Sequence, residues 1–153
     1  GEKLMTALLK PNLVAQEEEV VKEKAKEVVD FLNLGHLSNE LAGNLSGGQK
    51  KLLELGRTMM VDAKLVLLDE VGAGVNRTLL KDLGSAIEKL NKEKGYTFCM
   101  IEHDMDFIGR LCDPVIVMDE GSVLVEGSVE EAKKEEKVID SYLGRGSKIK
   151  GQK

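Results

Sequence analysis

The sequence has few of the features that mark disulfide-bonded, membrane-spanning or nucleic-acid-binding proteins. Its only two cysteines, Cys99 and Cys112, are far apart and have no partner motif, so we expect buried thiols in a reducing compartment, without a disulfide framework or a metal role. No apolar stretch approaches the roughly 20 residues of a membrane-spanning helix, and no signal peptide is recognisable. The net charge of −5 disfavours a nucleic-acid groove. At 153 residues, 42% of them hydrophobic, one domain with its own core is expected.

The most informative segment of the sequence is the pentapeptide Leu45-Ser46-Gly47-Gly48-Gln49, which comes immediately before a run of residues with helical apolar spacing. That spacing predicts a helix over 49–61 with the serine and glycines at its start. The first N–H groups of a helix have no partner inside it and the helix dipole is positive there, so an anion is favoured. Glycines let a phosphate approach the backbone closely. The segment therefore predicts a phosphate-contacting surface.

Two later segments are short apolar runs that end on polar groups. Residues 64–69 close on Asp69 and Glu70, and residues 96–101 close on Glu102, His103 and Asp104. Both patterns are typical of buried parallel strands. In open α/β sheets ligands bind at the carboxyl ends of the strands, so these side chains are candidates for a site.

The remaining elements alternate between helix and strand. Apolar spacing after Glu17 predicts a helix that Gly35 ends. Helices are expected over 77–93, 104–112 and 128–142, and strands over 115–118 and 122–125, with a turn at Glu120-Gly121. This order argues for an α/β fold with a mostly parallel sheet, flanking helices and a carboxyl-terminal hairpin.

Loop, helix, acid-tipped strand, helix and histidine-tipped strand, in this order, resemble the nucleotide-binding domain of ATP-binding cassette (ABC) proteins, a P-loop NTPase fold. The resemblance runs from about Glu17 to Gly144. It is strongest to the ATP-binding subunits of branched-chain amino acid importers, through three segments: 101–106 (IEHDMD), 117–121 (VMDEG) and 138–144 (VIDSYLG).

One element of that family is missing from the sequence. A Walker A loop, G-x-x-x-x-G-K-[ST], cradles the β- and γ-phosphates, and the nearest string, 43–50, has Gln49 where the lysine should stand. Gln16 matches the family's loop glutamine by letter only. We therefore expect the carboxyl-terminal portion of one cassette, without the Walker A strand and loop. In it, 1–44 would end the helical subdomain, 45–144 would carry the signature, Walker B, D-loop and H-loop, and 145–153 would form a flexible tail. Gly1 in place of methionine suggests a cut or tagged protein.

The resemblance assigns roles to three residues at the strand ends. Asp69 would hold Mg²⁺ through a water, with a helix cap as the alternative. Glu70 would orient and deprotonate the attacking water, with an exposed glutamate as the alternative. His103 would be the switch histidine that contacts the γ-phosphate, with a satisfied surface or core histidine as the alternative.

The resemblance also assigns contacts across a head-to-tail pair of cassettes. Ser46, Gly47, Gly48 and Gln49 would touch the nucleotide of the partner cassette, and an N-cap by Ser46 is compatible with that role. In the loop 70–76, Val71 and Asn76 replace the usual proline and aspartate, a variant similar to that of branched-chain importers. Asn76 keeps the acceptor but loses the charge.

The function implied is that of an importer ATP-binding subunit that couples hydrolysis of ATP, with Mg²⁺, to amino acid transport, branched-chain amino acids above all. Its partners would be a second ATPase subunit and membrane permease subunits, on the cytoplasmic face of the cell membrane. This chain alone is expected to be inactive and to self-associate through a strand edge that the absent Walker A strand leaves open. Two alternatives stay open: the carboxyl-terminal lobe of a chromosome-maintenance or DNA-repair ATPase head, and a regulatory half-cassette without turnover.

Overall fold

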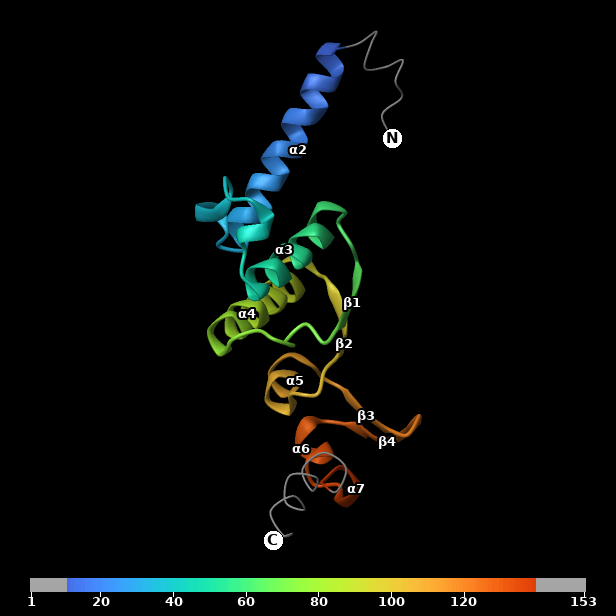
Figure 1. Cartoon of the computed structure of the whole chain (residues 1–153). Helices are drawn as coiled ribbons and strands as arrows, with labels where there is room; N and C mark the ends of the chain where they lie inside the picture. The colour runs from blue at the N-terminus through green and yellow to red at the C-terminus, as the bar shows by residue number, and fades with distance from the viewer. Residues whose placement is uncertain (1–10, 140–153) are drawn as a thin grey trace. The chain divides into compact units, whose positions relative to one another are not determined.

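The computed structural model describes residues 11–139, which form two compact units (Figure 1). The first unit contains residues 11–66 and 71–99, and the second contains 67–70 and 100–139. The expected tail, 145–153, lies outside the described residues. In chain order the elements are α2 (Pro11–Phe31), η1 (Gly35–Leu37), η2 (Ala42–Asn44), α3 (Gly47–Met60), β1 (Leu65–Asp69), α4 (Arg77–Lys94), β2 (Thr97–Ile101), α5 (Met105–Leu111), β3 (Val115–Asp119), β4 (Ser122–Gly127), α6 (Val129–Ala132) and α7 (Glu136–Val138).

Helix α2 begins six residues before the position expected from its apolar period. Its first residue is Pro11, not Glu17. Proline suits the first position of a helix because its fixed φ is helical and its missing N–H would have no partner there. Near the other end of α2, Val28 and Leu32 are buried and lie against Gly56 of α3. The expected start was therefore wrong, whereas the apolar positions at the carboxyl end of α2 do form its packing face.

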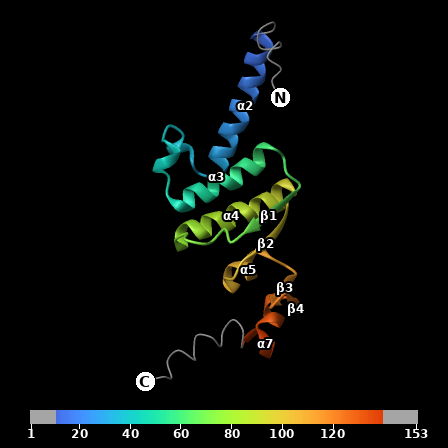
Figure 2. The ribbon, with the colours of Figure 1, turned by 45° about the vertical axis from the view of Figure 1, so that its right-hand side comes forward.

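Helices α3 and α4 lie side by side in the first unit (Figure 2). Gly48, at the start of α3, is so close to Leu79 that an added Cβ would fall 2.9 Å from the Leu79 Cβ. Apolar residues of both helices fill the core of this unit: Leu52, Leu55, Met59, Leu83, Ala86, Ile87 and Leu90. Gly95, at φ 70°, ends α4 in the left-handed conformation that glycine adopts readily.

Strands β1 and β2 pair with each other, and among the described residues neither has another strand beside it. The Thr97 N–H donates to Lys64 O at one end of the pair, and the Glu70 N–H donates to Ile101 O at the other. Because the two beginnings meet and the two ends meet, the strands run parallel, as expected.

The expectation that β1 and β2 are buried was wrong for one face of the pair. Val66 is buried, but the side chains of Leu65, Leu67 and Ile101 are 58%, 73% and 64% exposed. A strand buried on both faces needs cover on both sides, and within 11–139 only alternate residues are covered. Cys99 belongs to this open face and is exposed, and Cys112 is half-buried. The prediction of two buried thiols was therefore wrong as well.

The second unit contains the antiparallel hairpin of β3 and β4. Its turn is Glu120-Gly121, as expected, with φ of 46° and 78°, the positive values that tight two-residue hairpins require. Val115 and Val117 point into a small core with Val129, Ala132 and Val138.

The single helix expected over 128–142 was wrong. Two short helices, α6 and α7, stand in its place, and residues 140–142 lie outside the described part. The turn between them lets Ala132 and Val138, which are 0% and 1% exposed, reach the same core beneath the hairpin. Within residues 11–139, no helix combines the length and the apolar character needed to cross a membrane.

Candidate functional site

The loop before α3 is organised by a reciprocal pair of hydrogen bonds. The Gln49 N–H donates to the Ser46 hydroxyl (3.3 Å), and the Ser46 N–H donates to Gln49 Oε1 (2.8 Å). This capping box satisfies two donors at the start of the helix. The N–H groups of Gly47 and Gly48 are then the ones at the helix start that remain to meet an anion. The N-cap anticipated for Ser46 is confirmed.

The two glycines of this loop differ in their surroundings. A Cβ at Gly47 would meet no heavy atom closer than Gly74 O, at 4.0 Å, whereas one at Gly48 would overlap Leu79. Gly48 therefore needs to be glycine for packing of α3 on α4, and Gly47 presents open backbone. A phosphate could approach the backbone at Gly47 without displacing a side chain.

Asn76 caps the next helix of the same unit. Its Oδ1 accepts a hydrogen bond from the Leu79 N–H at 3.0 Å, which begins α4. The loop before it turns at Gly74, where φ is 71°. The acceptor expected at Asn76 is therefore used locally, and this residue fixes where α4 starts.

In the second unit, the end of β1 places two exposed acidic residues next to each other. Asp69 is the last residue of β1, and Glu70 follows with φ of 44°. Positive φ is uncommon for a residue with a side chain and is frequent at functional sites. The hydrogen bond from the Glu70 N–H to Ile101 O, at 2.9 Å, fixes Glu70 beside the end of β2.

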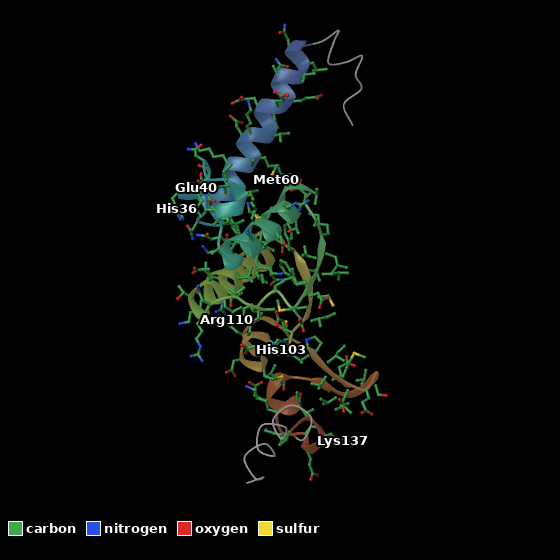
Figure 3. The ribbon with its side chains drawn as sticks, viewed as in Figure 1. His36, Glu40, Met60, His103, Arg110 and Lys137 are labelled. Carbon is green, nitrogen blue, oxygen red and sulfur yellow. The ribbon has the colours of Figure 1, made fainter. Side chains whose placement is uncertain are left out.

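His103 lies just past that end of β2 (Figure 3). Its Nδ1 is 3.9 Å from Glu70 Oε1, and the two side chains are 69% and 60% exposed. The next residue, Asp104, accepts from the N–H groups of Asp106 and Phe107, both at 3.0 Å, and so caps α5. The structure thus brings together the two side chains that the resemblance marks as catalytic, on anchored backbone and open to a ligand.

A third carboxylate belongs to this cluster and was given no role from the sequence. Glu102 Oε2 lies 4.0 Å from His103 Nδ1, and the Glu102 side chain is only 1% exposed. The alternation of side chains along β2 could have indicated this burial. Phe98 and Met100 are the covered residues of the strand, and the period of two places residue 102 on the same face.

The donor set suits a magnesium ion held mainly by nucleotide. Within the described part of the chain, no three His, Cys, Asp or Glu side chains gather as a metal cluster. Asp69 offers one exposed carboxylate at a strand end, and Mg²⁺ is commonly bound through one or two carboxylates together with substrate phosphates and water. The residues therefore fit Mg²⁺ with Asp69 as the protein ligand.

Comparisons with known proteins agree with this geometry. The family model described as ABC transporter matches residues 4–73. A probable branched-chain amino acid transport ATP-binding protein, LivG, of Archaeoglobus fulgidus is 44% identical over 129 residues, which are 84% of this chain and 50% of that protein. The protein of the same description in Methanocaldococcus jannaschii is 40% identical over 94% of this chain and 57% of its own length.

Solved structures give the same result. The nucleotide-free ATP-binding cassette of an ABC transporter matches with a TM-score of 0.75 and 36% identity, over 93% of this chain and 57% of that one. The ADP conformation of an ABC transporter cassette matches with a TM-score of 0.73 and 38% identity, over 81% and 50%. This chain spans about half the length of the curated relatives it matches. With the ABC transporter match and these relatives, the chain belongs to the family of ABC transporter ATP-binding proteins and is homologous to the ATP-binding proteins of branched-chain amino acid importers.

Proposed function

We propose that this chain provides the carboxyl-terminal part of one ABC ATPase domain, in a subunit that hydrolyses ATP to drive import of amino acids. The pairing of Glu70 and His103 at 3.9 Å is the observation that carries the proposal. A general base must lie within reach of the attacking water, directly or through small movements. A histidine beside it can contact the phosphate that the water attacks.

Each residue of the cluster has one task in this proposal. Glu70 orients the water and accepts its proton. His103 donates to an oxygen of the γ-phosphate, and Asp69 holds Mg²⁺. When bound, the ion supplies positive charge to the phosphate oxygens, which is the main electrostatic requirement of phosphoryl transfer.

The capped loop of α3 takes the phosphate of a neighbouring subunit. The open backbone of Gly47 and the preorganised Ser46 and Gln49 support this role, because fixed donors stabilise charge without reorganising. Asn76, at the start of α4 in the same unit, belongs to the same surface by family resemblance. The partner is then a second ATPase subunit in a head-to-tail pair.

Branched-chain amino acids are the proposed cargo, since the relatives at 44% and 40% identity are described as proteins of branched-chain amino acid transport. Permease subunits in the membrane would be the second kind of partner. The subunit would lie on the cytoplasmic face of the cell membrane and reach it through those permeases.

The test uses a chimeric cassette, in which residues 45–139 of this chain replace the corresponding segment of a full-length relative. Glu70→Gln should abolish most phosphate release while ATP still binds, because Glu70 makes no main contact with ground-state phosphate. Glu126→Gln, on the exposed end of β4, is the matched control and should keep full turnover. Loss of ATP binding together with turnover in Glu70→Gln would show that Glu70 is not the catalytic base.

A further inference from the structure

The buried carboxylate of Glu102 lies next to the largely exposed imidazole of His103. The His103 side chain is 69% exposed. The backbone on either side of it is anchored, by the hydrogen bond from the Glu70 N–H to Ile101 O and by the cap that Asp104 forms on α5. Anchored backbone leaves the imidazole free to rotate about its own side-chain bonds. Something else must fix which ring nitrogen faces the nucleotide.

Both carboxylates near the ring approach the same nitrogen. Glu70 Oε1 and Glu102 Oε2 lie 3.9 and 4.0 Å from Nδ1. They differ in mobility, since the Glu70 side chain is 60% exposed and the Glu102 side chain 1%. A buried carboxylate keeps its position, and its charge acts in a medium of lower effective dielectric than water.

We propose that Glu102 is a positioning residue that holds His103 with Nδ1 toward the carboxylates and Nε2 toward the nucleotide. The partner of one ring nitrogen sets the protonation and orientation of the other. A proton on Nδ1 is stabilised by Glu102 and Glu70. Donation from Nε2 to a γ-phosphate oxygen needs a second proton on the ring, so in the nucleotide complex Nδ1–H faces the carboxylates and Nε2–H faces the phosphate. The proposal rests on the proposed function only for its last step, the contact with phosphate.

The first experiment needs no activity and uses the 153-residue chain. The sequence has two histidines, His36 and His103, and His36 is exposed in η1 of the other unit, so it serves as an internal reference. Imidazole ¹⁵N spectra give the tautomer of each ring, and side-chain relaxation gives its mobility. We expect His103 to show more Nδ1–H tautomer and less ring motion than His36.

Two substitutions separate positioning from mere packing. Glu102→Gln keeps the shape and removes the charge, and Glu102→Met also removes the acceptor. Both should move the tautomer ratio and ring mobility of His103 toward the values of His36, and the backbone spectrum of β2 and α5 should stay unchanged. Glu126→Gln is the control and should change neither ring. A His103 ring that matches His36 in the wild-type chain, or one that is unaltered by Glu102→Gln, would overturn the proposal.

The second experiment follows the effect into catalysis. In the full-length cassette, Glu102→Gln should lower kcat on the order of tenfold, as small misplacements of catalytic groups do, with KM for ATP unchanged. Glu102→Asp should recover part of the loss. If the wild-type cassette shows no ATPase activity, the proposed function fails while the spectroscopic result still decides the role of Glu102. An unchanged kcat in Glu102→Gln, beside an active wild type, would exclude positioning.

Discussion

Lys24 donates from Nζ to Oδ2 of Asp62 across 2.8 Å, and this contact joins α2 to the turn that follows α3. Asp62 has φ of 49°, a left-handed conformation that Asp tolerates at a helix end. The hydrogen bond and charge of Lys24 lower the pKa of Asp62 below its ordinary value of 3.8. The same turn lies close enough to Tyr96 for its charge to add to burial, the larger cause, in raising the pKa of that phenol.

The first prediction is an acid-dependent loss of stability at this contact. A carboxyl whose pKa is lower in the folded state contributes stability above its unfolded pKa, and the contribution is lost as pH falls through the folded pKa. The free energy of unfolding of the wild type should therefore exceed that of Asp62→Asn above about pH 4 and converge with it in stronger acid. Urea unfolding between pH 2 and 7 measures both curves.

Lys24→Met provides the second arm of that experiment, since it removes the donor and keeps the aliphatic stem. It should reproduce the pH dependence of Asp62→Asn, and the double substitution should add little to either. Curves for wild type and Asp62→Asn that run parallel across the whole range would contradict the proposed linkage.

The second prediction concerns Gly48. An added Cβ would fall 2.5 Å from Leu79 Cδ1 and 2.9 Å from its Cβ, and the Leu79 Cβ cannot move aside by changing rotamer. Overpacking costs about 1 to 3 kcal/mol, and the better helix propensity of alanine returns up to about 1 kcal/mol. Gly48→Ala should therefore destabilise the chain by about 1 to 2 kcal/mol in urea unfolding.

Gly43→Ala is the matched control, because a Cβ there has nothing within 4 Å. Its free energy of unfolding should stay within about 0.5 kcal/mol of wild type. If Gly48→Ala were equally neutral, the close approach of α3 and α4 at this point would be wrong.

Local chemistry explains why much of the fold could be predicted from the sequence. The start of α3 follows from Ser46 and Gln49, the end of α4 from Gly95, and the hairpin turn from Glu120-Gly121, and each depends on residues within a few positions. The site could be anticipated in part for the same reason, since Glu70 and His103 each follow the end of a strand and parallel strands bring their ends together.

The errors arise where burial depends on what covers a surface. The apolar run of β1 is typical of a strand buried on both faces, yet Leu67 is 73% exposed within the described chain. Periodicity records that a face is apolar and not that it has a partner. The burial of Glu102 was missed for a related reason, because a charged residue after a strand is ordinarily exposed. Only its alternation with Phe98 and Met100 along β2 indicates that its side chain is covered.

The third prediction is that the 153-residue chain does not turn over ATP. The sequence has no G-x-x-x-x-G-K-[ST] segment, and the backbone and lysine of that segment make the main grip on the β- and γ-phosphates. Phosphate release with Mg²⁺ and ATP should not exceed the rate without protein, and ATP binding should be weak by calorimetry. Mg²⁺-dependent turnover that disappears in Glu70→Gln would refute this.

The last prediction is self-association through the β1–β2 pair, which has one exposed apolar face and two outer edges without a neighbouring strand among the described residues. Leu65, Leu67 and Ile101 expose apolar surface there, and within residues 11–139 neither strand has another strand on its outer edge. Exposed apolar strands with unpaired N–H and C=O groups favour pairing with another chain. Sedimentation should therefore give a mass that rises above 16.8 kDa with concentration. Leu67→Lys should shift it back toward the monomer, because a buried lysine would be costly.

Val61, 75% exposed at the end of α3 and outside the strands, offers the control: Val61→Lys should associate like wild type. A wild-type chain that stays monomeric at high concentration would rule out this role of the open strands.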